Sequence, residues 1–95
     1  MTFYVYIIYS VKLQRFYIGT TDNISQRLSE HNSAKYSGSF TEKGIPWELY
    51  FSIECNSSQQ AYKLEKFIKK MHSSVFIKKL KVDPELLEGL LKRFE

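Results

Sequence analysis

The chain has 95 residues, 43% of them hydrophobic and 16% aromatic, so residues 1–95 are long enough for one small domain and too apolar to be disordered. Its longest apolar run, residues 3–9, is far shorter than the roughly 20 residues of a membrane-spanning helix, and we expect no secretion signal. The single cysteine, Cys55, excludes an internal disulfide and predicts a reducing, cytoplasmic compartment, while the net charge of +4 arises within residues 60–95.

Two segments near the N-terminus predict an antiparallel hairpin. Residues 3–9 (FYVYIIY) are rich in β-branched and aromatic side chains, as buried strands are, and residues 15–19 (RFYIG) have a similar composition. Residues 10–14 lack an Asn-Gly or Asp-Gly pair, so the type of turn stays open. With simple strand pairing, Tyr6 and Tyr17 share one face of the hairpin.

The middle of the chain predicts a short helix, a loop and a third strand. Thr21 or Asp22 can cap a helix that runs to about residue 32 and projects Arg27 and His31 from the same side. Residues 33–45 are rich in Ser, Gly and Lys and predict a loop. Residues 46–54 (PWELYFSIE) predict a strand that begins at a proline.

Three helical segments are expected after the third strand. The first follows capping residues 56–58 and carries an apolar stripe, which consists of Ala61, Leu64, Ile68 and Met71. Residues 75–80 form a second, short segment, and the sequence Asp-Pro-Glu at 83–85 starts a final helix over residues 83–95. The predicted order is β-β-α-β-α-α-α, an α/β (α+β) fold in which helices flank a three-stranded antiparallel sheet.

Positive charge gathers in the first two of these helices. Between Lys63 and Lys81 there are seven lysines and one acid, Glu65. Such a surface suits a polyanion, because each neutralised phosphate releases counterions. A solvated helix face explains the same charges, so charge alone leaves both interpretations open.

Several separated motifs together resemble the GIY-YIG nuclease family. Val5-Tyr6, followed by Tyr17-Ile18-Gly19, is similar to its paired signature, with Tyr4 at the place of the first glycine. Arg27 follows Gly19 by eight residues, His31 comes four residues later, and Glu65 lies in the sequence AYKLEKFIKK. The resemblance covers residues 3–81. The chain is similar to the small bacterial single-domain members of the family and to the N-terminal nuclease domain of the excision-repair incision subunit.

The resemblance implies a divalent-metal-dependent endonuclease that hydrolyses DNA phosphodiester bonds in repair or processing. Glu65 would bind Mg²⁺ or Mn²⁺, and a single acid suffices because Mg²⁺ keeps several of its waters. Backbone at Gly19 and Thr20 would approach the phosphate, although Thr20 stands where some members carry a lysine. Some family members have a functional asparagine beyond the helix that corresponds to that of Glu65. No asparagine of this sequence can be assigned that role.

The resemblance assigns the remaining catalytic roles to side chains of the hairpin and the first helix. Tyr6 would act as the general base or orient the attacking water, with Tyr17 sharing the site, and which of the two is the base stays open. Arg27 would clamp the scissile phosphate with its planar guanidinium. His31 would hydrogen-bond the phosphate or Tyr6.

Nucleic-acid contacts are expected from lysines of the loop and of the lysine-rich helix, namely Lys35, Lys43, Lys63, Lys66, Lys69 and Lys70. Two alternatives to the nuclease remain: a nucleic-acid-binding module of the same fold with little or no hydrolysis, and a small basic domain that binds an acidic protein. Trp47 and Tyr50 are expected in the core, and Cys55 is expected to pack without a catalytic part. The sequence does not decide between DNA and RNA or fix the oligomeric state.

Overall fold

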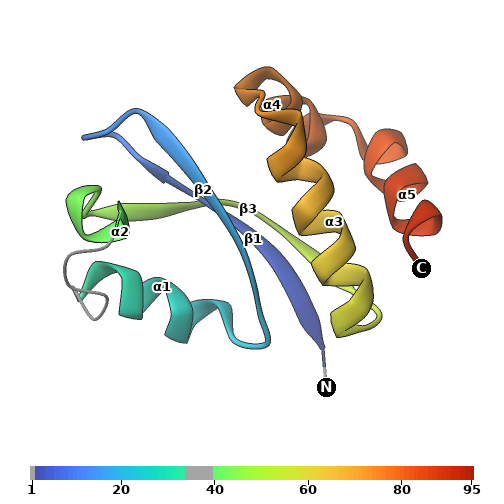
Figure 1. Cartoon of the computed structure of the whole chain (residues 1–95), viewed down its shortest axis with the longest axis horizontal. Coiled ribbons are helices and arrows are strands. Elements are labelled where there is room, and N and C mark those ends of the chain that lie inside the picture. The colour runs from blue at the N-terminus through green and yellow to red at the C-terminus, as the bar shows by residue number, and fades with distance from the viewer. Residues whose placement is uncertain (1, 34–39) are drawn as a thin grey trace.

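The computed structural model describes residues 2–33 and 40–95, and it contains a three-stranded antiparallel sheet between two groups of helices (Figure 1). The elements are β1 (Phe3–Ser10), β2 (Arg15–Thr21), α1 (Ile24–Asn32), α2 (Phe40–Lys43), β3 (Trp47–Cys55), α3 (Ser58–Met71), α4 (Ser74–Val82) and α5 (Pro84–Arg93). The predicted order is confirmed, with α2 as an added short helix. None of the helices in these residues has the length and apolar character needed to cross a lipid bilayer.

The strand order is β2-β1-β3, so the N-terminal strand is the central one. The register places Tyr6 opposite Gly19 of β2 and opposite Ser52 of β3. On the β3 side the pairing shifts between Ile7 and Ile8, which leaves Tyr50 as an extra residue in a β-bulge. The β1–β2 pairing has no such shift, which confirms the simple hairpin register expected from the sequence.

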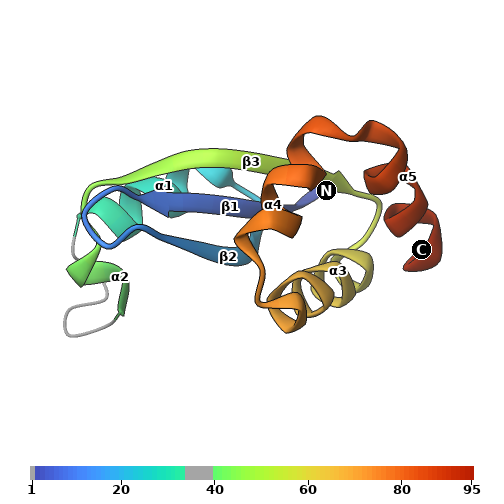
Figure 2. The same ribbon diagram turned by 90° about the horizontal axis from the view of Figure 1, so that it is seen from above.

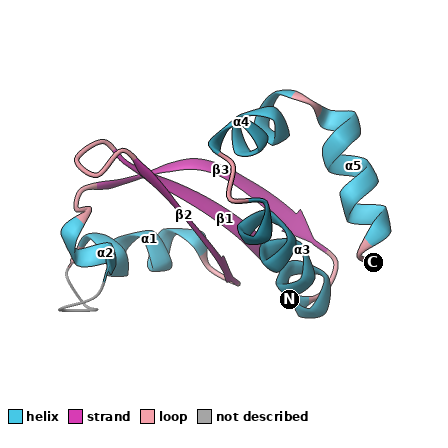
Figure 3. Ribbon diagram, turned by 45° about the horizontal axis from the view of Figure 1, so that its top comes forward, coloured by secondary structure: helices cyan, strands magenta, loops and turns pink. Residues whose placement is uncertain are grey.

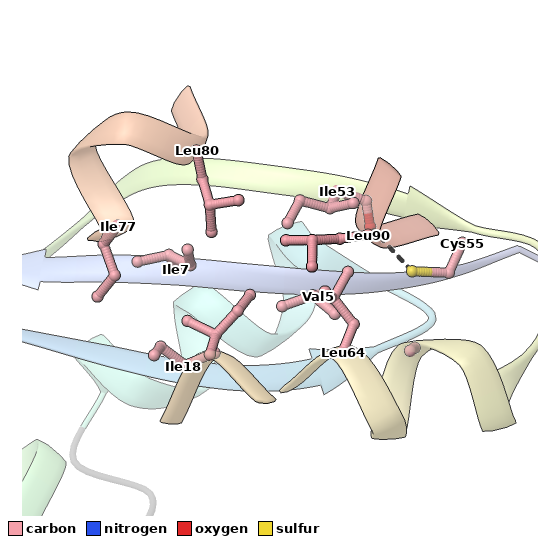
Figure 4. Packing of buried hydrophobic residues seen from close by; sticks show 11 residues of the cluster. Val5, Ile7, Ile18, Ile53, Cys55, Leu64, Ile77, Leu80 and Leu90 are labelled. Atoms are coloured by element: carbon pink, nitrogen blue, oxygen red, sulfur yellow. Dashed lines mark hydrogen bonds between the residues drawn. The ribbon is translucent and has the colours of Figure 1, made fainter. Parts of the chain in front are cut away.

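Alternation along β1 supplies the sheet with two apolar faces. Val5 and Ile7 pack on one face with Ile18 of β2 and with side chains of α3, α4 and α5. Figure 4 shows Ile77 and Leu80 pointing from α4 toward Ile7 and its neighbours. This larger cluster is the main core, and it fixes α3 against the sheet.

The opposite face carries a smaller core around Tyr6, Ile8 and Trp47. Ile24 and Leu28 of α1 pack against it. Figures 1 and 3 show α1 and α2 on one side of the strands and α3, α4 and α5 on the other. Figure 2, viewed from above, places α2 near the β1–β2 turn and α5 at the other end of the molecule. The two tyrosines of the motif thus face α1.

Several sequence expectations need correction. Residues 33–45 are not all loop, since 40–43 form α2; the indole Nε1 of Trp47 donates to the Thr41 carbonyl oxygen at 2.6 Å, a contact that local composition does not reveal. The cap of α1 is Asn23, whose Oδ1 accepts the Gln26 N–H at 3.1 Å. Met71 is 43% exposed and lies outside the core, because α3 ends there.

Caps and core positions elsewhere agree with the sequence. Ser57 caps α3, and Asp83 followed by Pro84 begins α5. Trp47 and Cys55 are buried, and burial raises the pKa of the Cys55 thiol. That direction keeps the thiol protonated and agrees with a packing role.

Gln60 joins α5 to the start of α3. Its side chain is 2% exposed; its Nε2 donates to the Leu91 carbonyl oxygen at 2.7 Å, and its Oε1 accepts the Asn56 N–H at 2.6 Å. Loss of this amide leaves two backbone groups without their partner.

We expect Gln60→Ala to lower the free energy of unfolding by about 2 kcal/mol, because each unsatisfied buried polar group costs about 1–3 kcal/mol. Gln59→Ala is the matched control, since Gln59 is exposed and precedes Gln60 in the same helix. Its effect should stay within about 0.5 kcal/mol in urea denaturation. Equal effects of the two variants would contradict the proposed link between α3 and α5.

Candidate active site

A buried hydrogen bond between Tyr6 and His31 forms the centre of the site. The Tyr6 hydroxyl lies 2.9 Å from His31 Nε2, and the two residues are 2% and 4% exposed. Tyr6 comes from the central strand β1 and His31 from the last turn of α1. The bond therefore ties the helix to the sheet at the motif itself. Of the two partners that the resemblance offered His31, Tyr6 is the one that the fold provides.

The environment of His31 keeps its imidazole neutral. Burial lowers the His31 pKa below its usual value of 6.5, the Arg27 guanidinium lowers it further, and the Glu30 carboxylate raises it in part. A neutral imidazole has one protonated nitrogen and one acceptor nitrogen. When Nε2 is the acceptor, the Tyr6 hydroxyl donates to it, and His31 is placed to take the Tyr6 proton.

Gly19 makes room for this tyrosine. A Cβ atom at position 19 would lie 2.5 Å from the Tyr6 hydroxyl oxygen, closer than real Cβ contacts. The Tyr6 hydroxyl fills the space that a Cβ at position 19 would take. The approach of a phosphate to the backbone of Gly19 and Thr20 stays a prediction. The glycine is needed because its strand pairs with β1 directly opposite Tyr6.

Tyr17 lies beside this pair, as the shared strand face predicts. Its ring centroid is 6.5 Å from that of Tyr6 and 5.1 Å from that of His31. The Trp47 ring, at 6.2 Å, supports it from β3. Tyr17 is only half-buried, so one phenol of the motif lies in the interior and the other remains partly open to solvent.

Arg27 lies in a cleft of about 360 Å³ where β2, α1 and α3 meet. The cleft is lined by Phe3, Thr20, Thr21, Asp22, Gln26, Arg27, Glu30, Ser58 and Ala61. Arg27 Nη1 lies 3.7 Å from Glu30 Oε1, and the Arg27 side chain keeps 39% of its surface exposed. Glu30 holds the guanidinium, a role that sequence reasoning missed although the spacing of three residues on one helix could have indicated it.

Glu65 belongs to α3, which packs on the face of the sheet opposite to Tyr6 and Tyr17. It lies one helical turn after Ala61, which lines the cleft of Arg27. Its Oε2 is 3.4 Å from Lys69 Nζ, and its side chain is 14% exposed. Lys69 Nζ is 6.0 Å from the centroid of the Tyr17 ring. Lys69 thus connects the acid to Tyr17 past the edge strand β2.

Glu65 is the one carboxylate that the sequence analysis assigned to a metal ion. Among residues 2–33 and 40–95, no group of three or more His, Cys, Asp or Glu side chains could hold an ion. Mg²⁺ often takes only one or two protein carboxylates and completes its shell with waters and substrate phosphate. Glu65 fits an ion bound in that way, in competition with the ammonium of Lys69.

The predicted nucleic-acid lysines lie on the surface. Lys43 is exposed at the end of α2, and Lys63, Lys66 and Lys70 are exposed on α3. Lys35 lies outside the residues that the structure describes.

The arrangement can be compared with known proteins. The profile of the GIY-YIG catalytic domain matches residues 2–81. The chain belongs to the GIY-YIG family. In this GIY-YIG domain, Tyr6, Tyr17 and His31 lie together on β1, β2 and α1. Among the residues that the structure describes, Glu65 of α3 is linked to them only through Lys69.

Two relatives have similar lengths. A UPF0213 protein of Syntrophus aciditrophicus (strain SB) is 37% identical over 82 residues, which is 86% of this chain and 93% of the relative. The solution NMR structure of a UPF0213 protein of Bacillus halodurans is 29% identical, covers 86% of this chain and 83% of its own, and gives a TM-score of 0.48. Family membership supports a nuclease role for this GIY-YIG domain.

We expect Gly19→Ala to displace the Tyr6 hydroxyl and break its bond to His31. The loss in free energy of unfolding should be about 1–3 kcal/mol, as for overpacked cores. Gly89→Ala is the control, because a Cβ at Gly89 meets nothing within 4 Å and the change favours a helix by up to about 1 kcal/mol. Thermal unfolding measures both variants. A Gly19→Ala protein as stable as wild type would contradict the contact.

We expect NMR titration of the imidazole signals to place the His31 pKa below 6.5. Arg27→Gln should raise it and Glu30→Gln should lower it, following the sign of each charge. Because the folded pKa lies below the unfolded one, the stability contributed by neutral His31 is complete above about pH 6.5 and is lost as pH falls through the folded pKa. A His31 pKa at or above 6.5 would contradict this environment.

Proposed function

We propose that this protein is a divalent-metal-dependent endonuclease that hydrolyses phosphodiester bonds of DNA, in repair or processing. The observation that carries the proposal is the buried Tyr6–His31 hydrogen bond at 2.9 Å, beside a second phenol and an arginine of the same motif. Phosphodiester hydrolysis needs a proton acceptor for water and positive charge for the transition state. The described residues supply both.

The proton acceptor is the Tyr6–His31 pair. A free phenol has a pKa of about 10 and is a poor base at neutral pH. Neutral His31 accepts the Tyr6 proton, which makes the phenol oxygen available for the proton of the attacking water. Tyr17, half-buried next to both rings, orients that water.

Positive charge for the transition state comes from Arg27. Its planar guanidinium can hold two oxygens of the scissile phosphate, and Glu30 fixes its orientation. Glu65 would hold Mg²⁺ or Mn²⁺. When bound, the ion neutralises charge on the phosphate and on the leaving oxygen.

One contact favours a second candidate, a nucleic-acid-binding module without hydrolysis. Lys69 lies 3.4 Å from the only carboxylate assigned to the metal, and its ammonium already neutralises that charge. In such a module, Lys69 and the exposed lysines of α3 would bind the phosphate backbone.

We expect the wild type to nick supercoiled plasmid or cut branched DNA with Mg²⁺ and to stop when EDTA removes the metal. Glu65→Gln and Arg27→Ala should each lower the cleavage rate by at least about 100-fold, as for lost electrostatic groups at other active sites. Tyr6→Phe should lower it by about 100-fold or more, the usual contribution of a general base.

Glu88→Gln is the control for Glu65→Gln. Glu88 also pairs with a lysine four residues later, Lys92 at 3.3 Å, but on the exposed side of α5. It should cut like wild type. Wild type that binds DNA with a steep salt dependence and never cuts would favour the binding module. No salt-dependent DNA affinity at all would contradict both proposals and leave the interaction domain for an acidic protein.

A further inference from the structure

A second, larger cleft lies on the face of the sheet that points away from Tyr6. Its volume is about 1040 Å³, and it opens between the β1–β2 end of the sheet, the end of α3 and the start of α4. Its lining includes Tyr9, Arg15, Phe16, Ile18, Tyr50 and Lys78. Tyr9 pairs with Phe16, and Ile18 pairs with Ile7 of the main core, which fixes the face. The motif residues Tyr6, Arg27 and His31 are absent from this lining.

An aromatic row lies in this cleft, with one ring from each strand and Phe16 of β2 in contact with both Tyr9 of β1 and Tyr50 of β3. The ring centroids of Tyr9 and Phe16 are 4.8 Å apart, and those of Phe16 and Tyr50 are 4.9 Å apart. Tyr50 is the extra residue of the β-bulge, so it is free of the alternation that sets the other side chains of β3. All three rings are half-buried and keep part of their surface open.

The rim of the cleft is basic. Arg15, Lys69 and Lys78 line it and are exposed, and its lining contains no Asp or Glu. Lys81 adds a cation 4.3 Å from the centroid of the Tyr50 ring. Of the nearby acids, Glu65 forms an ion pair with Lys69, and Glu48, which lies opposite Tyr9 in the strand register, does not line the cleft.

We propose that this cleft binds an unpaired nucleic-acid strand, with bases stacked on the aromatic row and phosphates held by Arg15 and Lys78. Cationic grooves that contain aromatic rings bind single strands in this way, because every base has a face that can stack. The bases of a duplex are already stacked on one another and would leave the rings unused. An acidic peptide would neutralise the basic side chains but would offer no bases to stack on the aromatic rings.

The position of Lys69 supports this occupant. Lys69 lines the cleft, pairs with Glu65 at 3.4 Å and lies 6.0 Å from the Tyr17 ring centroid. A strand held in the cleft therefore passes the edge of β2 next to the proposed catalytic groups. The binding itself requires no hydrolysis, so the inference goes beyond the proposed function and can be tested apart from it.

The test is the binding of a fluorescein-labelled oligothymidylate of about twelve nucleotides, within the range of single-strand sites. Anisotropy is measured in EDTA, and a gel verifies that the oligonucleotide stays intact. Phe16→Leu keeps an apolar side chain and should weaken binding about tenfold without changing the salt dependence. Arg15→Glu and Lys78→Glu should each weaken binding and reduce the slope of log K against log salt by about one or more.

Lys92→Glu makes the same charge change on α5, outside the cleft, and is the control. An equal loss with this variant would overturn the proposal, because net charge alone would then explain the binding. A blunt duplex of the same length, or polyglutamate, that binds as tightly and with the same sensitivity to Phe16→Leu would also overturn it. NMR shifts at Tyr9, Phe16 and Tyr50 on adding the oligonucleotide support it; shifts confined to Tyr6, Tyr17 and Arg27 contradict it.

The two proposals fail separately. The wild type can cut DNA while Phe16→Leu, Arg15→Glu and Lys78→Glu bind the oligonucleotide normally. That result would support the nuclease proposal and overturn the cleft proposal. If the wild type never cuts DNA but binds the oligonucleotide through these residues, the nuclease proposal is overturned and the cleft proposal stands.

Discussion

The contact of Tyr6 with Gly19 on one side and His31 on the other is the constraint on which the site depends. β1 is the central strand, so whatever Tyr6 touches is fixed relative to the whole sheet. The missing side chain at Gly19 leaves room for the phenol, and the hydrogen bond to His31 sets the position of the last turn of α1. Arg27 lies one turn earlier on the same helix. One buried bond thereby positions the phenol, the imidazole and the guanidinium together.

The same contact links chemistry to stability. A buried histidine that stays neutral costs the fold little at neutral pH and more in acid, because the unfolded chain takes up the proton first. The burial that lowers the His31 pKa therefore also makes the packing of α1 sensitive to pH. Arg27 and Glu30 act on His31 with opposite sign. Their ion pair balances the electrostatic environment of the histidine as well as orienting the guanidinium.

Helix α3 has one side in the core and another in solvent. Ala61, Leu64 and Ile68 fix it against the sheet, while its lysines stay in solvent. Lys69 lies between the small site around Tyr17 and the large basic cleft on the other face. In the proposed cleft, a nucleic-acid partner would be held by backbone charge and stacking rather than by base-specific contacts.

Patterns along the chain were enough to predict the helices and strands and to identify the residues of the motif. Strand alternation, the cap at Ser57 and the Asp83-Pro84 start are local, because they depend on residues within a turn or on neighbours along a strand. The spacing from Tyr6 to Glu65 likewise indicated the GIY-YIG family before any contact was known.

Only the tertiary structure decided what those residues touch. The reason that position 19 must be glycine lies thirteen residues away in Tyr6, and the neutral state of His31 depends on burial by a strand 25 residues earlier. Helix α2 formed against Trp47, and Tyr50 joined the aromatic row through a bulge in β3 that composition does not predict. Burial, charge environment and ring contacts arise between segments distant in sequence, so they appear only when the chain is folded.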